Sequence, residues 1–202
     1  DLSKAKNLLL KSSKIFAAVS IPGMLFIFIF SRQIMGLWMG DTFASNSYMI
    51  LSVLTLSSLF ASQTTMPNLI ISGLGYSKLV GFFGVLAIIC YCIFLPVGSK
   101  NFGVLGTSAG MLLTTLVNIG FVFFFVAKKL EINLKEYFSE TFKFHIIPFL
   151  AGLLIFWFNY YTNFRISTMI AGVVLLIVYL FLLMVKGEFP VNIFSRKNTV
   201  SK

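Results

Sequence analysis

Long apolar stretches without charge alternate with short polar segments along this chain. A helix of about 20 apolar residues can cross the roughly 30 Å hydrocarbon core of a membrane. The sequence holds six stretches of this kind, each free of Asp, Glu, Lys, Arg and His: residues 15–31, 48–71, 79–97, 104–127, 146–161 and 166–185. Strands of a membrane barrel would alternate apolar and polar residues, whereas residues 173–178 are apolar throughout. The pattern therefore predicts an all-α fold, a polytopic transmembrane bundle of six helices.

The segments outside these stretches are short and basic. Residues 1–14 combine four lysines with four leucines, which predicts a basic amphipathic segment on the cytoplasmic membrane surface. Residues 186–202 are expected to form a basic cytoplasmic tail, and the longest connection, 128–145, is too short for a soluble domain. The function must therefore belong to the helices or to their ends.

Composition and charge placement support a membrane protein. Only 11% of the 202 residues are charged, against about 25% in soluble domains. Thirteen of the 16 Lys and Arg residues lie in the first, third, fifth and seventh segments outside the stretches. Cytoplasmic segments carry such an excess, so we expect six crossings with both termini in the cytoplasm. The net charge of +10 is then a topology signal, and we expect no nucleic-acid partner.

A polar stripe runs along the second apolar stretch. Small polar residues recur there every three or four positions and cover a sector of about 120° on a helix. They are Ser58, Ser62, Thr65, Asn68 and Ser72, with Gln63 beside them. Such side chains can bond neighbouring membrane helices, or they can line a hydrophilic cavity, because amides in hydrocarbon need partners. The sequence leaves both interpretations open.

The fourth apolar stretch carries small residues at every fourth position, Gly106, Gly110, Thr114 and Asn118. This spacing lets helix backbones approach closely, so we favour a packing role, with Asn118 as the one candidate cavity group. Prolines interrupt two stretches, at Pro22-Gly23 and at Pro67. Each removes a backbone hydrogen bond and predicts a kink, which is either a hinge for a transport cycle or a static bend.

The sequence shows no motif for catalysis or metal binding. It lacks a phosphate-binding Gly-x4-Gly-Lys-[Ser/Thr] element, and His145, the single histidine, has no acidic or cysteine partner at ligand spacing. Cys90 and Cys92 lie within an apolar run, and no stretch holds a carboxylate of the kind that proton-coupled carriers use. We expect no cofactor, no metal site and no enzymatic activity.

Four segments resemble, in their order along the chain, segments of a family of flippases. Residues 37–44 are similar to an outer-loop element of polysaccharide-biosynthesis flippases, and residues 70–78 resemble their inner turn of small residue, Gly and basic residue. Residues 102–110 resemble their Tyr-Gly-Ile-x-Gly-Ala-Ala helix start, and Lys4–Lys14 resembles the amphipathic segment that joins their two lobes. The family comprises lipid-linked oligosaccharide (O-antigen) flippases of the multidrug/oligosaccharidyl-lipid/polysaccharide exporter superfamily.

The resemblance implies two six-helix lobes around a hydrophilic cavity in the bacterial plasma (inner) membrane. This chain, which begins with Asp, would be the C-terminal lobe, a fragment whose partner is a missing N-terminal lobe. Family members typically hold cationic residues in the cavity, and here only Arg32 and Lys78, at helix mouths, could assist.

The expected function is therefore translocation of lipid-linked oligosaccharide, an undecaprenyl-pyrophosphate sugar unit, by alternating access. Expected partners are that substrate, membrane lipids, and a polysaccharide polymerase or glycosyltransferases. One alternative is a cation-coupled small-molecule (multidrug) exporter of the same superfamily. Another is a non-transporting membrane scaffold for polysaccharide enzymes.

Overall fold

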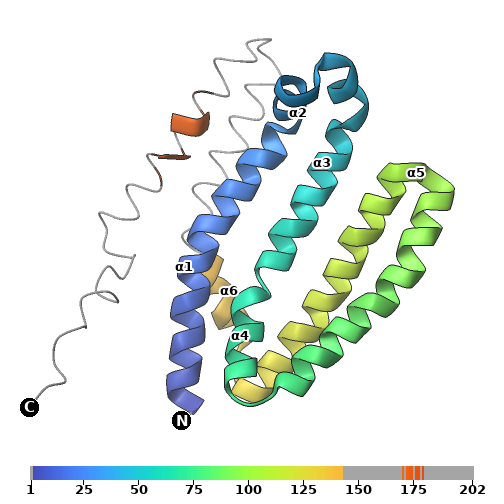
Figure 1. The fold of residues 1–202 in the computed structure, drawn as a ribbon. Coiled ribbons are helices and arrows are strands. Elements are labelled where there is room, and N and C mark those ends of the chain that lie inside the picture. Colours follow the sequence, from blue (N-terminus) through green and yellow to red (C-terminus); the bar gives the residue numbers. More distant parts are fainter. Residues whose placement is uncertain (1, 143–169, 171, 175, 178, 180–202) are drawn as a thin grey trace, which may run out of the picture.

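The computed structural model describes residues 2–142, 170, 172–174, 176–177 and 179, and the regular elements of this part are helices (Figure 1). They are α1 (Leu2–Ile29), α2 (Ser31–Met39), α3 (Asp41–Ser62), α4 (Thr65–Gly73), α5 (Ser77–Leu130) and α6 (Leu134–Phe142). The expected span 146–161, the tail 186–202 and most of 166–185 lie outside the described residues.

Three helical segments of the described chain are long and apolar enough to cross a membrane. They are Leu2–Ile29, Asp41–Gly73, which combines α3 and α4, and Ser77–Leu130. The chain is thus a helical membrane protein over the part that the structure describes. The count of six spanning helices stays a prediction.

The first helix is continuous across the boundary that the charge pattern suggested near residue 14. α1 joins the basic segment to the first apolar stretch and also runs through Pro22 without interruption. Leu, Lys, Ala and Ser dominate residues 2–14, and no Gly or Pro precedes Pro22 to end the helix. Placement of the basic half on the cytoplasmic membrane surface stays a prediction.

α5 is a helical hairpin rather than one straight rod. Its backbone leaves the helical region at Gly103, where φ is 61° and ψ is −140°, a conformation that favours glycine. The ribbon reverses direction in this part of α5 and returns alongside itself (Figure 1). The two limbs correspond to the predicted helices 79–97 and 104–127, and Pro96 lies before the reversal.

Glycines allow the two limbs of α5 to touch. A Cβ atom built on Gly106 would collide with the carbonyl oxygen of Gly98, and the reverse holds for a Cβ on Gly98. A Cβ on Gly110 would lie 2.8 Å from the carbonyl oxygen of Phe94. The packing interpretation of the small-residue spacing is therefore confirmed for Gly106 and Gly110.

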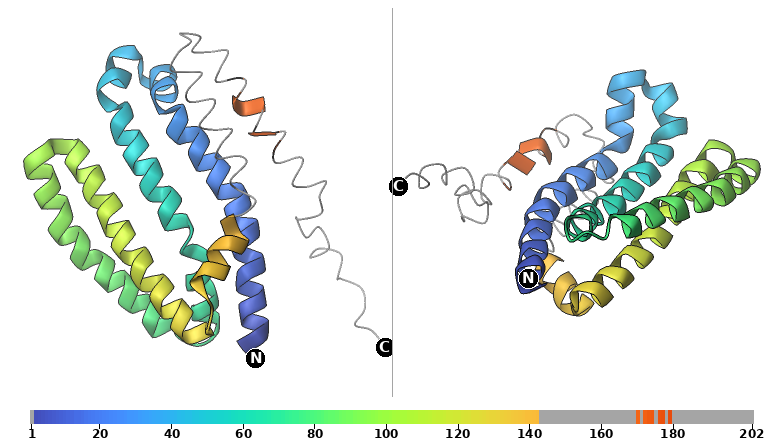
Figure 2. Two further views of the ribbon diagram at one scale, coloured as in Figure 1. Left: turned by 180° about the vertical axis from the view of Figure 1, so that it is seen from behind. Right: turned by 60° about the horizontal axis from the view of Figure 1, so that its bottom comes forward.

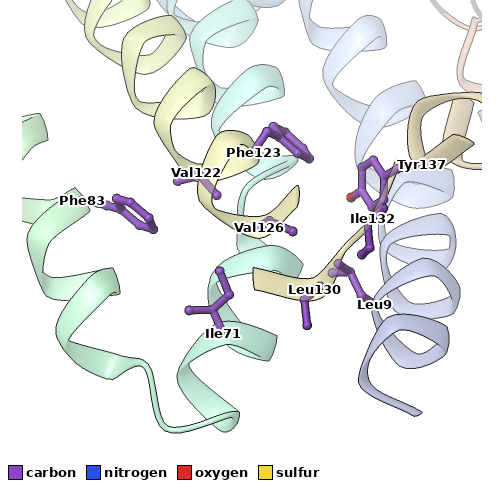
Figure 3. Close-up of a cluster of buried hydrophobic side chains, with 9 residues drawn as sticks. All are labelled: Leu9, Ile71, Phe83, Val122, Phe123, Val126, Leu130, Ile132 and Tyr137. Atoms are coloured by element: carbon purple, nitrogen blue, oxygen red, sulfur yellow. The ribbon is translucent and has the colours of Figure 1, made fainter. Parts of the chain in front are cut away.

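An apolar cluster ties the elements together at the end of the bundle where α1 begins (Figure 3). Its buried members come from α1, α4, both limbs of α5, the α5–α6 connection and α6: Leu9, Ile71, Phe83, Val122, Phe123, Val126, Leu130, Ile132 and Tyr137. The Phe123 and Tyr137 rings lie 5.4 Å apart, which fastens α6 to the second limb of α5. α6 also packs against α1, as both views of Figure 2 show.

Two of the connections between the predicted spans contain helix. Residues 32–47 include all of α2 except its first residue, and also the first turns of α3, with Gly40 at φ 88° between the two helices. The segment 128–145 includes α6. Both are short and amphipathic, with polar residues among the apolar ones, and therefore lack the long uncharged run by which spans are recognised.

Candidate functional site: the polar face of α3 and α4

The helix that carries the polar stripe is broken between α3 and α4. Pro67 has no N–H group, so the carbonyl of Gln63, four residues earlier, receives no helical hydrogen bond from it. Hydrogen bonds between residues three apart replace the helical pattern here. The Gln63 amide donates to the Phe60 carbonyl and the Thr64 amide to the Ala61 carbonyl, each at 3.1 Å. The kink expected at Pro67 is thus present as an interruption of the helix, whereas Pro22-Gly23 lies within the uninterrupted α1.

Side chains at this break bond one another and the carbonyls of Leu59 and Ala61. Ser62 Oγ donates to the Leu59 carbonyl at 2.7 Å, and Gln63 Nε2 donates to Ser62 Oγ at 2.9 Å. Asn68 differs, because its Oδ1 atom is buried and has no hydrogen-bond partner within the described chain. A buried amide oxygen needs a donor, so a water, a substrate group or another residue must supply one there.

We use "polar face" for the five predicted residues on these helices, Ser58, Ser62, Gln63, Thr65 and Asn68. Ser58 and Thr65 are exposed, and the other three are half-buried among the described residues. The face carries no charge, since residues 48–71 hold no ionisable acid or base. It therefore offers neutral hydroxyl and amide groups, which suit hydrogen bonding to other neutral polar groups.

A neighbouring pair does bond helices together, and pattern reading missed it. Ser57 is buried, and its Oγ lies 2.9 Å from Thr115 Oγ1 on the second limb of α5. A second pair, Ser31 and Ser52, joins the start of α2 to α3 at 2.8 Å. Ser57, next to the polar face, thus bonds α5, while Ser58 and Thr65 stay uncovered by the described residues. Ser57 directly precedes the first residue of the stripe, and this position is the feature of the sequence that could have indicated its role.

The remaining predicted site residues are not brought to this face. Asn118 is half-buried on the second limb of α5, and in the described structure no hydrogen bond joins its amide to the polar face. Arg32 and Lys78 are exposed and lie at opposite ends of the bundle, near the start of α2 and of α5 (Figure 1). The Arg32 guanidinium lies 5.9 Å from the centre of the Tyr48 ring. Within the described residues, no group of His, Cys, Asp and Glu is placed to hold a metal ion.

The long apolar helices define the chain as a membrane protein. Its similarity to a known protein points to polysaccharide transporters: 108 residues are 24% identical to a Shigella flexneri protein named "Putative O-antigen transporter". The match covers 54% of this chain and 26% of that relative, so the chain spans well under half of the relative's length. No family model matches the chain, and no solved structure matches it.

Proposed function

We propose that the whole protein, of which this chain is one lobe, translocates a lipid-linked oligosaccharide across a bacterial plasma membrane by alternating access. The observation that carries the proposal is the uncharged polar face on a helical segment long and apolar enough to span a membrane, taken with the similarity to a protein named as an O-antigen transporter. The chain would act as a carrier and not as an enzyme.

A sugar headgroup needs such a face because moving its hydroxyls into hydrocarbon without partners costs several kcal/mol per group, roughly 2–7. Ser58 and Thr65 are exposed among the described residues and carry hydroxyl groups. These groups can replace part of the water that the sugar loses. The pyrophosphate would require cations, and the six uncharged stretches predicted from the sequence hold none, so we assign that role to the N-terminal lobe.

The break before Pro67 gives the polar face a place to bend. Because the Gln63 carbonyl lacks its usual helical donor, we expect α4 to change its direction relative to α3 more easily here than within a regular helix. Such discontinuous helices are a recurring feature of transporter binding sites. We propose this break as the hinge, with both chain termini in the cytoplasm and with polymerase or glycosyltransferase partners on the pathway.

The test replaces the uncovered hydroxyls in the complete protein. Ser58→Leu combined with Thr65→Leu should strongly reduce surface polysaccharide in cells that depend on the protein, at unchanged protein level. Thr107→Leu is the control, because Thr107 is a partly buried threonine near the reversal of α5. Normal polysaccharide in the double variant would remove the polar face from the transport pathway.

The alternatives predict different outcomes. A scaffold for polysaccharide enzymes would tolerate the double variant and fail when the 128–145 segment is altered. A cation-coupled exporter would need a carboxylate within the membrane, and because the six predicted uncharged stretches hold none, the N-terminal lobe would have to supply it.

A further inference from the structure

The turn between α4 and α5 holds an aromatic ring in a fixed position at one end of the bundle. Gly75 adopts φ 90°, its amide donates to the Ser72 carbonyl at 3.0 Å, and the Tyr76 amide donates to the Ile71 carbonyl at 3.1 Å. These two bonds are the Schellman pattern that ends helices at a left-handed glycine. The Ser72 and Ser77 hydroxyls lie 3.3 Å apart across the same turn. These hydrogen bonds therefore fix the conformation of the backbone that carries Tyr76.

A lysine from the far end of α5 lies on this ring. Lys129 Nζ is 4.6 Å from the centre of the Tyr76 ring, within the range of a cation–π contact. Lys128 is its neighbour in the last turn of α5, Lys78 lies two residues after Tyr76, and all three lysines are exposed. We call Tyr76, Lys78, Lys128 and Lys129 the lysine cluster. Tyr76 directly precedes α5, and the three lysines lie at the two ends of α5, which the hairpin brings to the same end of the bundle (Figure 1).

The position of the lysine cluster fits the headgroup layer of a membrane. Tyr76 separates two segments that are each long and apolar enough to span, and Lys129 is one residue from the end of the second. Tyrosine prefers this depth, and Tyr76 is 41% exposed. The acidic residue nearest to Lys129 in the sequence is Glu131. It lies two positions later and is also exposed.

We propose that the lysine cluster binds the phosphate of an anionic phospholipid headgroup. Lys129 and Lys78 supply the charge, and the Tyr76 ring positions the Lys129 ammonium rather than touching the phosphate. Lysines clustered at the membrane surface attract such headgroups, and each lysine near the surface contributes about fivefold in affinity. The lipid would hold the α4–α5 turn against the second limb of α5. This binding goes beyond the proposed transport and does not depend on it.

The test is native mass spectrometry of the purified full chain in detergent with equal amounts of phosphatidylglycerol and phosphatidylcholine. We expect preferential retention of phosphatidylglycerol, reduced about fivefold by Lys129→Ala. Lys100→Ala is the matched control. Lys100 is also exposed but lies near the reversal of α5, and its replacement removes the same charge. Tyr76→Leu should also reduce the preference, whereas Tyr76→Phe, which keeps the ring, should retain it.

Three results would overturn the assignment. They are equal retention of the two lipids by the unmodified chain, an equal loss in Lys129→Ala and Lys100→Ala, and displacement of phosphatidylglycerol by millimolar inorganic phosphate. The last would mean that the lysine cluster takes a free anion rather than a lipid.

Discussion

Adding a single methyl group to the glycines of α5 perturbs the hairpin at a defined point. An alanine Cβ at position 110 would lie 2.8 Å from the Phe94 carbonyl oxygen and 3.0 Å from its carbon. At position 106 the Cβ would meet the carbonyl group of Gly98 at still closer range. In both cases the obstacle is backbone of the opposite limb, which cannot rotate away, so the limbs must separate.

The size of the effect follows from a control on the same limb. A Cβ on Gly120 has no heavy atom within 4 Å, so Gly120→Ala brings only the gain of a better helix former, about 0.5–1 kcal/mol. Gly106→Ala and Gly110→Ala bring the same gain and also an overpacking cost of about 1–3 kcal/mol. The difference between each variant and Gly120→Ala isolates the cost of separating the limbs.

The assay is reversible unfolding of the full chain in mixed micelles, with the free energy of unfolding measured for each variant. The expected order of stability is Gly120→Ala above Gly110→Ala, and Gly110→Ala above Gly106→Ala. Equal free energies for the three variants would refute the close contact of the limbs. They would also refute the reversal at Gly103 on which that contact depends.

Two further predictions concern the surroundings of the polar face. Ser57→Ala and Thr115→Val, combined in a double-mutant cycle of unfolding, should show a coupling of about 0.6 and at most about 1.7 kcal/mol. Zero coupling would mean that α3 and α5 do not meet at this pair. Pro67→Ala restores an amide that can donate to the Gln63 carbonyl, so the α3–α4 segment should straighten and surface polysaccharide should fall at constant protein level. Unchanged polysaccharide would make the break a static bend.

The features that the sequence predicted are those that depend on local chemistry. Continuous apolar runs located both limbs of α5, because a span must be long and uncharged wherever it packs. Pro67 indicated the break between α3 and α4, since a missing N–H acts on the residue four positions earlier. The spacing of Gly106 and Gly110 indicated close packing, although Gly98 as the partner could not be read from it.

The features that it did not predict depend on tertiary placement. The lysines of residues 1–14 suggested a separate surface segment, yet long lysine side chains can extend away from an apolar surface while the helix continues. Along the polar stripe, periodicity placed the residues on one side of a helix but could not tell which edge faces a neighbour. Ser57, just before the stripe, is the residue that bonds α5, and Ser58 is uncovered.

The most direct test of the central claim is cysteine labelling of the polar face in cells. After replacement of Cys90 and Cys92, Thr65→Cys and Ile88→Cys are compared, because both positions are exposed in the structure and only Thr65 belongs to the polar face. A hydrophilic maleimide should react with the cysteine at 65 and spare the one at 88, which would face lipid. If the cysteine at 65 is as unreactive as the one at 88, with and without active polysaccharide synthesis, the polar face is dry and the transport proposal is wrong.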